Sequence, residues 1–207
     1  MTRAYSSALR SERAAANRRA VIDTATEMFC EIGWVATTMA GVAKAAGLTR
    51  QTVYQQFDAK LTLLDACIDN ALTHGDGGAV RGMPTYRAMG VGTFDERLTA
   101  GAAWLRAAHE RSARIQNVLD QAAVTDAEAA DRLHVREQQR WDEVAHALSL
   151  ILGDTTVSPA RNDSIVDSVW LLASRRTWLM LVEGRGWSPQ QWEDWFRAQV
   201  AATLRRQ

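Results

Sequence analysis

Residues 38–60 constrain the fold of this chain more than any other stretch. Apolar residues recur there at helical spacing, and Gly47 then supplies the left-handed residue that ends a first short helix. Thr49 follows at a position where a hydroxyl can cap a second helix by accepting a backbone N–H. The second helix turns Val53 and Phe57 inward and its polar residues outward. A helix, a glycine-containing turn and a polar second helix predict a helix-turn-helix, which is a DNA-binding unit.

Extended back to residue 20, this stretch resembles the TetR family of bacterial transcriptional regulators. The family shows a glycine and an aromatic residue after a helix, then a Thr-[ST] pair, then I-A-x-x-A-G-V-S, then Y-x-H-F-x-x-K-x-x-L-L. The residues that match, in order and without a gap, are Gly33-Trp34, Thr37-Thr38, Val42-Ala43, Ala46-Gly47-Leu48-Thr49, Tyr54-Gln55-Gln56-Phe57, Lys60 and Leu63-Leu64. Two positions depart from the pattern, because Gln56 replaces the usual His and Gln51 replaces a common Gly. Glutamine keeps hydrogen-bonding capacity, so these departures bear on the operator sequence and not on DNA binding.

The second helix of this unit carries the side chains that we expect to read bases. Arg50 can donate two hydrogen bonds to guanine and Gln51 can bridge adenine, with Thr52 and Gln55 as further candidates. By the family pattern, the phosphate contacts come from Thr37, Thr38, Tyr54 and Lys60. Such contacts fix the register on the duplex and carry no base code. The predicted DNA-binding set is Thr37, Thr38, Thr49, Arg50, Gln51, Thr52, Tyr54, Gln55, Gln56 and Lys60.

The charge distribution agrees with local contact to phosphates. The 207 residues include 24 basic and 24 acidic side chains, so the protein as a whole is not a polycation. Up to residue 60, however, eight basic residues face five acidic ones. A basic end on a neutral protein suits a duplex DNA operator as partner. No apolar run reaches the roughly 20 residues of a membrane span, and no signal core is present, so we expect a cytoplasmic protein.

The rest of the sequence predicts an all-α fold without strands or internal repeats. Helices are expected over about 12–32, 58–74, 94–110, 112–124, 126–152, 158–183 and 188–206. The glycine-rich stretch 75–92 is predicted to be a loop, partly helical around Tyr86, and either a plain connection or one rim of a ligand entrance. The predicted domains are a helix-turn-helix DNA-binding domain over 10–57 and a ligand-binding and dimerisation domain over 58–207, with 58–74 as a connecting helix.

The last two predicted helices carry more apolar surface than one helical partner can cover. Residues 165–182 are apolar nearly all round, which requires contacts on more than one side. A large exposed apolar patch usually marks an interface. We therefore infer a four-helix homodimer bundle, which the resemblance also implies. The expected dimerisation residues are Val169, Leu172, Arg176, Trp192, Trp195, Phe196 and Val200.

The resemblance implies that the C-terminal helices surround a cavity for a small effector. Seven of the eight tryptophans lie beyond the helix-turn-helix, and apolar pockets with few polar groups suit largely apolar or aromatic ligands. The candidate ligand-binding residues are Trp104, His109, Gln121, Trp141, Trp170, Arg175 and Trp178. His134 and His146 are further polar candidates, and each of these side chains could instead belong to the core or the surface.

Enzymatic and metal chemistry have little support in the sequence. The four histidines are dispersed, the two cysteines have no metal-type spacing and should be buried thiols, and no phosphate loop or nucleophile motif is present. We expect no catalytic residue, no metal and no cofactor. The favoured function is a homodimeric repressor that an effector releases from a palindromic operator. The alternatives are a helical small-molecule-binding or enzymatic protein with a vestigial helix-turn-helix, and a ligand-independent regulator.

Overall fold

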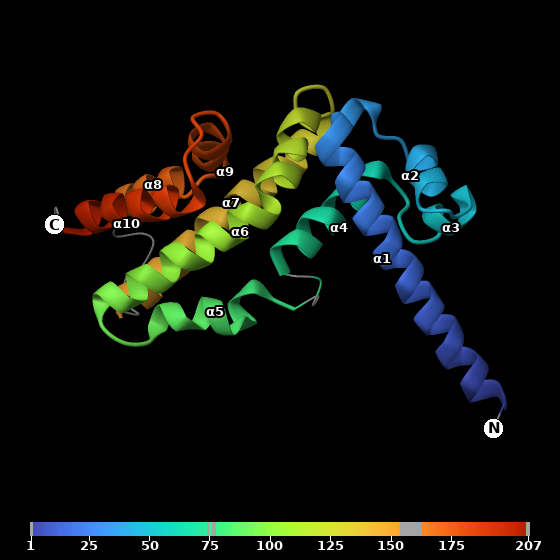
Figure 1. Cartoon of the computed structure of the whole chain (residues 1–207), viewed down its shortest axis with the longest axis horizontal. Helices are drawn as coiled ribbons and strands as arrows, with labels where there is room; N and C mark the ends of the chain where they lie inside the picture. Colours follow the sequence, from blue (N-terminus) through green and yellow to red (C-terminus); the bar gives the residue numbers. More distant parts are fainter. Residues whose placement is uncertain (1, 74, 76–77, 154–162, 206–207) are drawn as a thin grey trace.

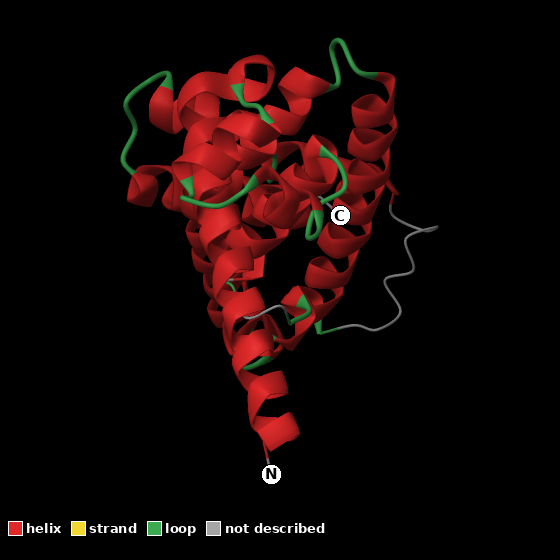
Figure 2. Cartoon of the chain, turned by 90° about the vertical axis from the view of Figure 1, so that its right-hand side faces the viewer, coloured by secondary structure: helices red, strands yellow, loops and turns green. Residues whose placement is uncertain are grey.

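The computed structural model describes residues 2–73, 75, 78–153 and 163–205, and within these residues the chain forms helices and loops without any strand (Figure 2). The predicted all-α fold is therefore confirmed. The α-helices are α1 (Thr2–Ala36), α2 (Met39–Ala45), α3 (Arg50–Tyr54), α4 (Lys60–Thr73), α5 (Pro84–Arg87), α6 (Phe94–Ala122), α7 (Ala127–Leu152), α8 (Asp163–Leu172), α9 (Arg175–Trp178) and α10 (Pro189–Arg205). Short turns of other helix types are η1 (Val80–Gly82), η2 (Ala88–Gly90) and η4 (Leu179–Glu183). None of the described helices combines the length and hydropathy that a membrane crossing requires.

The helices form two ends joined by a middle layer (Figure 1). One end holds α1, α2 and α3, and the opposite end holds α8, α9 and α10. Helix α4 and the long antiparallel pair of α6 and α7 lie between them. Any signal that passes from one end to the other must therefore pass through α4, α6 or α7.

Helix α1 is longer than the sequence predicted. It begins at Thr2 instead of near residue 12, and a short helical segment up to Ala36 follows the non-helical Gly33. Gly33 adopts φ +76° and ψ -179°, so it interrupts and bends the helix at the position where the sequence predicted an end. No glycine or proline precedes it from Thr2 onward, and both residues are the main breakers of a helix interior.

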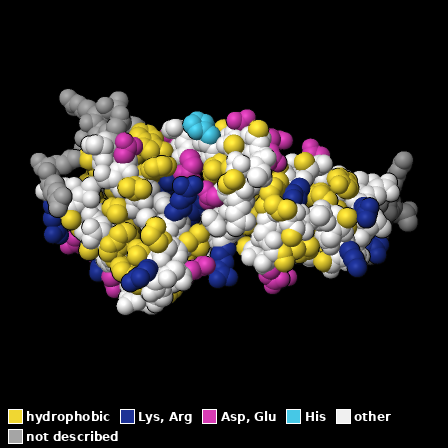
Figure 3. Space-filling model, turned by 90° about the horizontal axis from the view of Figure 1, so that it is seen from above, with side chains coloured by type: hydrophobic (Ala, Val, Ile, Leu, Met, Phe, Trp, Pro, Cys, Tyr) yellow, Lys and Arg dark blue, Asp and Glu magenta, His cyan; other side chains and the backbone are white. Residues whose placement is uncertain are grey.

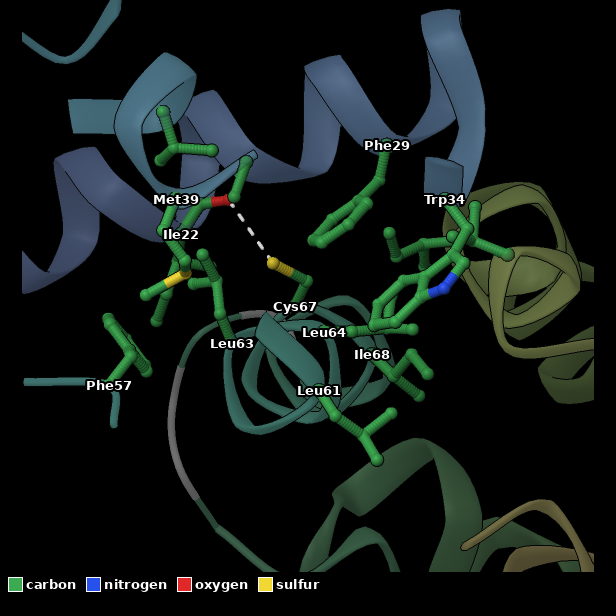
Figure 4. Close-up of a cluster of buried hydrophobic side chains, with 14 of the residues drawn as sticks. Ile22, Phe29, Trp34, Met39, Phe57, Leu61, Leu63, Leu64, Cys67 and Ile68 are labelled. Atoms are coloured by element: carbon green, nitrogen blue, oxygen red, sulfur yellow. Dashed lines mark hydrogen bonds between the residues drawn. The ribbon is translucent and has the colours of Figure 1, made fainter. Parts of the chain in front are cut away.

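The core of the DNA-binding end forms where α1, α2 and α3 close over α4 (Figure 4). Phe29 and Trp34 of α1 stack with ring centroids 6.0 Å apart. The Cys67 thiol of α4 donates to the Ile22 carbonyl oxygen at 3.6 Å, and burial raises the pKa of this thiol to about 12. Both cysteines are free, and Cys67 is buried as expected, whereas Cys30 is exposed, which corrects the prediction of two buried thiols.

Two predicted helix boundaries in the C-terminal part were wrong. Residues 94–122 form one continuous helix, α6, where the sequence suggested two helices that meet near residue 111. The polar residues at this point fit inside the helix, because Ser112 donates its hydroxyl to the Ala108 carbonyl oxygen at 2.7 Å. Conversely, the predicted helix over 158–183 is broken. Its predicted start lies outside the described residues, α8 ends at Leu172, and Ser174 caps a new helix by accepting from the backbone N–H groups of Arg176 and Thr177.

The other predicted ends are close to those of the structure. Asp126 caps α7 by accepting from the Ala129 N–H, and Gly153 ends α7 with φ +70°. Ser188 caps α10 in the same way. Helix α4 begins at Lys60 instead of at residue 58, and the Ala59 carbonyl accepts its first hydrogen bond. The glycine-rich stretch is partly helical around a buried Tyr86, as expected.

Candidate DNA-binding surface and ligand cavity

The turn between α2 and α3 has the geometry that its residues predict. Gly47 has φ +66°, its N–H bonds the Lys44 carbonyl, and the Leu48 N–H bonds the Ala43 carbonyl. This pair of bonds is the Schellman arrangement, which closes a helix on a left-handed residue. Thr38 caps α2 through the Gly41 N–H at 3.0 Å. The two helices therefore meet at a fixed angle.

Helix α3 presents its polar side to solvent. Thr49 caps it by accepting from the Thr52 N–H at 3.1 Å, and the two threonine hydroxyls lie 2.8 Å apart. The side chains that remain exposed on or next to this helix are Thr49, Arg50, Gln51, Tyr54 and Gln55. Val53 beneath them is fully buried and anchors the helix to the core. The structure thus gathers most of the predicted DNA-binding residues on one accessible surface.

Gln56 and Arg18 are tied together at the end of α3. An Arg18 Nη1 N–H donates to the Gln56 carbonyl oxygen at 3.3 Å, and the guanidinium lies 4.3 Å from the ring centroid of Phe57. The Gln56 side-chain oxygen is buried and has no hydrogen-bond partner among the described residues. The buried side-chain oxygen of Gln56 is therefore less accessible to DNA than the sequence suggested. The prediction did not include Arg18, and its only signal in the sequence is its membership of a basic pair.

Thr37 is misplaced for a phosphate contact. Its residue is fully buried, and its hydroxyl donates to the Gly33 carbonyl oxygen at 2.9 Å. The bend of α1 at Gly33 turns this side chain inward. The exposed Thr38 is the member of the pair that could meet a phosphate.

Lys60 is engaged within the protein. Its ammonium donates to the Trp34 carbonyl at 2.7 Å and to the Thr37 carbonyl at 3.0 Å. It also lies 3.9 Å from the ring centroid of Trp34, and partial burial lowers the pKa of this lysine. Lys60 therefore helps to close the end of α1, whose last carbonyls need donors, and its predicted phosphate contact stays a prediction.

A cavity of about 530 Å³ lies in the C-terminal part of the protein. Its wall is mostly apolar and includes side chains from α4, α5, α6, α7, α8, α9 and α10. Three predicted ligand-binding residues line it, namely Trp104, His109 and Arg175. The Trp104 ring meets the Tyr86 ring edge to face, with centroids 5.2 Å apart. A space of this size and character suits a small organic molecule.

His109 is a neutral member of the wall. It is buried, a ring nitrogen lies 3.2 Å from the Ala173 carbonyl oxygen, and burial lowers the pKa of its imidazole to about 3. Its ring packs against Trp178 and Trp192, with centroids 5.5 Å and 5.2 Å away. His109 therefore carries no charge at neutral pH.

Four predicted ligand-binding residues lie outside this cavity. Gln121 is exposed, and its side-chain oxygen lies beside the bend at Gly33, where an added Cβ would approach it to 3.1 Å. Trp141 donates its ring N–H to Asp167 at 2.8 Å, and Trp170 packs against the guanidinium of Arg140, so both belong to a surface groove. Trp178 belongs to the aromatic core and is not part of the cavity wall.

The two further histidine candidates also separate. His134 is exposed outside the cavity. His146 does not line the cavity, but its Nδ1 lies 3.1 Å from the Tyr86 hydroxyl, which also approaches a Glu143 carboxylate oxygen to 3.2 Å. Burial, together with Glu143, raises the pKa of the Tyr86 phenol.

Sequence reasoning missed several residues of the cavity wall. Tyr86 comes from the glycine-rich stretch, and Ser112 and Gln116 lie one turn apart on α6. Only their helical spacing could have indicated a shared face, and that signal does not say what the face covers. Charged residues of α7 also line the cavity, although charge usually indicates a solvent-exposed face.

The predicted dimerisation residues are mostly internal. Trp192, Phe196, Val169 and Val200 are buried within this single chain, where α8 and α10 pack on α6 and Trp192 stacks on Phe196 at 5.2 Å. They cannot form a surface for a second copy. Trp195 and Leu172 are partly buried, and Arg176 is exposed. The large apolar residues that do remain exposed here are Leu171 and Met180, at 60% and 61%.

Among the described residues, no cluster of His, Cys, Asp or Glu has the arrangement of a metal site.

Comparisons with known proteins agree with this geometry. Residues 21–67 match the family described as "Bacterial regulatory proteins, tetR family". A search of curated proteins found no match. Among solved structures, a protein from Rhodococcus sp. assigned to the TetR-family transcriptional regulators is similar over 91% of this chain and 99% of its own, with 16% identity and a TM-score of 0.65. A TetR-like transcriptional regulator from Rhodococcus sp. RHA1 is similar over 93% and 98%, with 17% identity and a TM-score of 0.57. At these identities, the likeness shows a common fold.

Proposed function

We propose that this chain, whose residues 21–67 match the TetR family, is a homodimeric repressor released from a palindromic operator by a small, largely apolar or aromatic effector. The observation that carries the proposal is the position of α4. One side of this helix belongs to the core of the DNA-binding end, through Leu61, Leu64 and Cys67. Its Ile68 and Leu72 line the cavity. A single rigid helix therefore contacts both the helix-turn-helix and the space for a ligand.

The mechanism follows from this shared helix. A ligand in the cavity displaces α4, and the displacement changes the separation of the two recognition helices in a dimer. A ligand shifts such an equilibrium only when it binds the two states with different affinity. The operator and the effector must then weaken each other's binding by the same factor.

Salt bridges tie α4 to α7 and extend this link. Arg136 pairs with Asp65 at 2.8 Å and with Asp69 at 3.0 Å, and Arg132 also pairs with Asp65. Arg136 and Asp69 line the cavity, so a ligand there meets the same side chains that hold α4 in place. This contact supports transmission through α4 rather than through the loops.

For DNA, we propose a contact set narrower than the one that the sequence suggested. Arg50, Gln51 and Gln55 read bases from the exposed side of α3, and Thr38 and Tyr54 contact phosphates. Thr49 and Thr52 form the cap of α3 and orient it. Two recognition helices in a dimer would reach half-sites roughly 34–36 Å apart.

For the dimer, we propose that a second copy covers the outer sides of α8, α9 and α10. The support is the pair of exposed apolar residues, Leu171 and Met180, with the exposed Arg176 nearby in sequence. Hydrophobic side chains come to the surface over this end of the molecule (Figure 3). This end lies opposite α1, α2 and α3, which leaves both DNA-binding units accessible.

We also propose the domain division 10–57 and 58–207, with 58–74 as the connecting helix. The core of the DNA-binding end includes Leu119 and Ala122 of α6 and Ala129 of α7. The proposed boundary at residue 57 therefore separates two functions, while the hydrophobic core of the DNA-binding end extends across it into the C-terminal part.

The test begins with selection of an operator from random duplexes, followed by fluorescence anisotropy with the selected duplex. We expect enrichment of a palindrome and an affinity that falls steeply as salt rises, because phosphate contacts release counterions. Absence of enrichment, or binding that salt does not change, would favour a protein with a vestigial helix-turn-helix. Screening of small organic molecules for release of the duplex then tests the effector, and failure of a broad screen would favour a ligand-independent regulator.

A further inference from the structure

The charges in the wall of the cavity are compensated by the protein itself. Six charged residues line it, three acidic and three basic, and they are Asp69, Arg136, Glu137, Arg140, Glu143 and Arg175. Each of them forms a salt bridge with an opposite charge, either within the wall or just behind it. Arg175 is an example, because its guanidinium donates a hydrogen bond to each carboxylate oxygen of Asp120, both at 2.8 Å.

These pairings decide what kind of ligand the cavity favours. A charged ligand would lose its hydration and would have to displace an existing partner to regain a counterion, and both steps are costly in a buried site. His109 adds no positive charge because burial keeps it neutral. An uncharged ligand meets neither penalty.

The wall includes two polar groups that have no hydrogen-bond partner among the described residues. One is the buried ring N–H of Trp104. The other is the side-chain carbonyl oxygen of Gln116, whose orientation follows from its neighbour Ser112. The Ser112 hydroxyl donates its only hydrogen to the Ala108 carbonyl oxygen. Toward the Gln116 side chain, the Ser112 oxygen can therefore act only as an acceptor. The Gln116 atom that lies 2.8 Å away must therefore be its amide nitrogen. This settles the orientation of the amide, and it leaves the Gln116 carbonyl oxygen without a partner among the described residues.

We propose that the effector is an uncharged, mostly apolar molecule with one hydroxyl or N–H group, and that this group donates to the carbonyl oxygen of Gln116. Ser112, which is fully buried, acts as a positioning residue that holds the amide. The proposal rests on the proposed function insofar as the cavity is the regulatory site. It adds the chemical class of the ligand and the residue that selects it.

The test uses three naphthalene probes of known chemistry and isothermal titration calorimetry on the full chain. They are 2-naphthol, which is uncharged and donates, 2-methoxynaphthalene, which is uncharged and cannot donate, and 2-naphthoate, which is an anion. We expect 2-naphthol to bind about 3- to 10-fold more tightly than 2-methoxynaphthalene, the worth of one net hydrogen bond, and 2-naphthoate to bind weakest. In the Gln116→Leu variant the ratio between the first two should fall to about one.

The matched control is Gln121→Leu, the same substitution on the same helix at an exposed residue outside the cavity. It should keep the wild-type ratio, and thermal melts of both variants verify that they fold. The proposal is overturned if 2-naphthoate binds most tightly, if Gln116→Leu keeps the ratio, or if none of the probes binds.

Anisotropy with the operator, run with the same probes, separates this proposal from the proposed function. A ratio that depends on Gln116 supports the ligand site even where no probe releases DNA, in which case the repressor mechanism alone fails. Release of DNA that Gln116→Leu leaves unchanged would support an effector response while refuting the role of Gln116.

Discussion

Replacement of Lys60 by methionine should weaken the fold, and not only the contact with DNA. Methionine keeps most of the aliphatic length but removes the ammonium that donates to the carbonyls of Trp34 and Thr37. Hydrogen bonds from a charged donor contribute about 1.5–3 kcal/mol each, and a cation over an aromatic ring adds about 0.5–1 kcal/mol. Because Lys60 is partly exposed, we discount this total and expect a loss of about 2–4 kcal/mol in the free energy of unfolding.

Urea unfolding followed by circular dichroism measures this loss. With a slope of about 2 kcal/mol per molar urea, the midpoint should fall by about 1–2 M. The chain has only one other lysine, Lys44, which is exposed in the last turn of α2. Lys44→Met is therefore a natural control, and it should change stability by less than about 0.5 kcal/mol. Both variants must be compared at the same protein concentration, because dimerisation adds to apparent stability.

The opposite pattern of stability and DNA binding would make Lys60 a DNA contact and not a structural residue. If Lys60→Met were as stable as the wild-type protein and bound operator with a salt slope reduced by about one, Lys60 would be a phosphate contact as the sequence suggested. The hydrogen bonds at the end of α1 would then contribute little to the fold.

Three further predictions concern the base contacts, the buried histidine and the dimer. Arg50→Ala should weaken the selected operator by about 1–3 kcal/mol in anisotropy and scrambled duplexes much less, and equal losses would exclude a base-reading role. The pKa of His109 is lowered to about 3, so the unfolded chain takes up a proton below about pH 6.5 that the folded chain refuses. The free energy of unfolding should therefore fall by roughly 1.4 kcal/mol per pH unit between pH 6 and 5. Urea titrations of the His109→Gln variant should lack this slope. Equal pH slopes for the variant and the wild-type protein would contradict the burial of a neutral His109. The double substitution of Leu171 and Met180 by Glu should yield folded monomers with weak operator binding in analytical ultracentrifugation and anisotropy, and an unchanged dimer would place the interface elsewhere.

The helix-turn-helix could be predicted because its signals are local. The caps of Thr38 and Thr49, the left-handed Gly47 and the buried Val53 each involve residues within a few positions of one another. Short-range geometry of this kind is set by backbone sterics and by side chains that bond their own turn. The all-α fold follows from the same local periodicity.

Contacts between distant residues decided the rest. Thr37 and Thr38 are adjacent and identical in type, yet the bend at Gly33 buries the first and exposes the second. Gln116 and Gln121 are both glutamines of α6, but only Gln116 lines the cavity. The rotation of each position around the helix axis and the placement of α7 determine which side chain faces the cavity. The many apolar residues of α8 and α10 indicated that other helices must cover them, and from the sequence alone we assigned these helices to a second copy of the chain. In the structure, α6 of the same chain covers Trp192 and Phe196, since hydrophobic burial has no direction and any apolar surface within reach satisfies it.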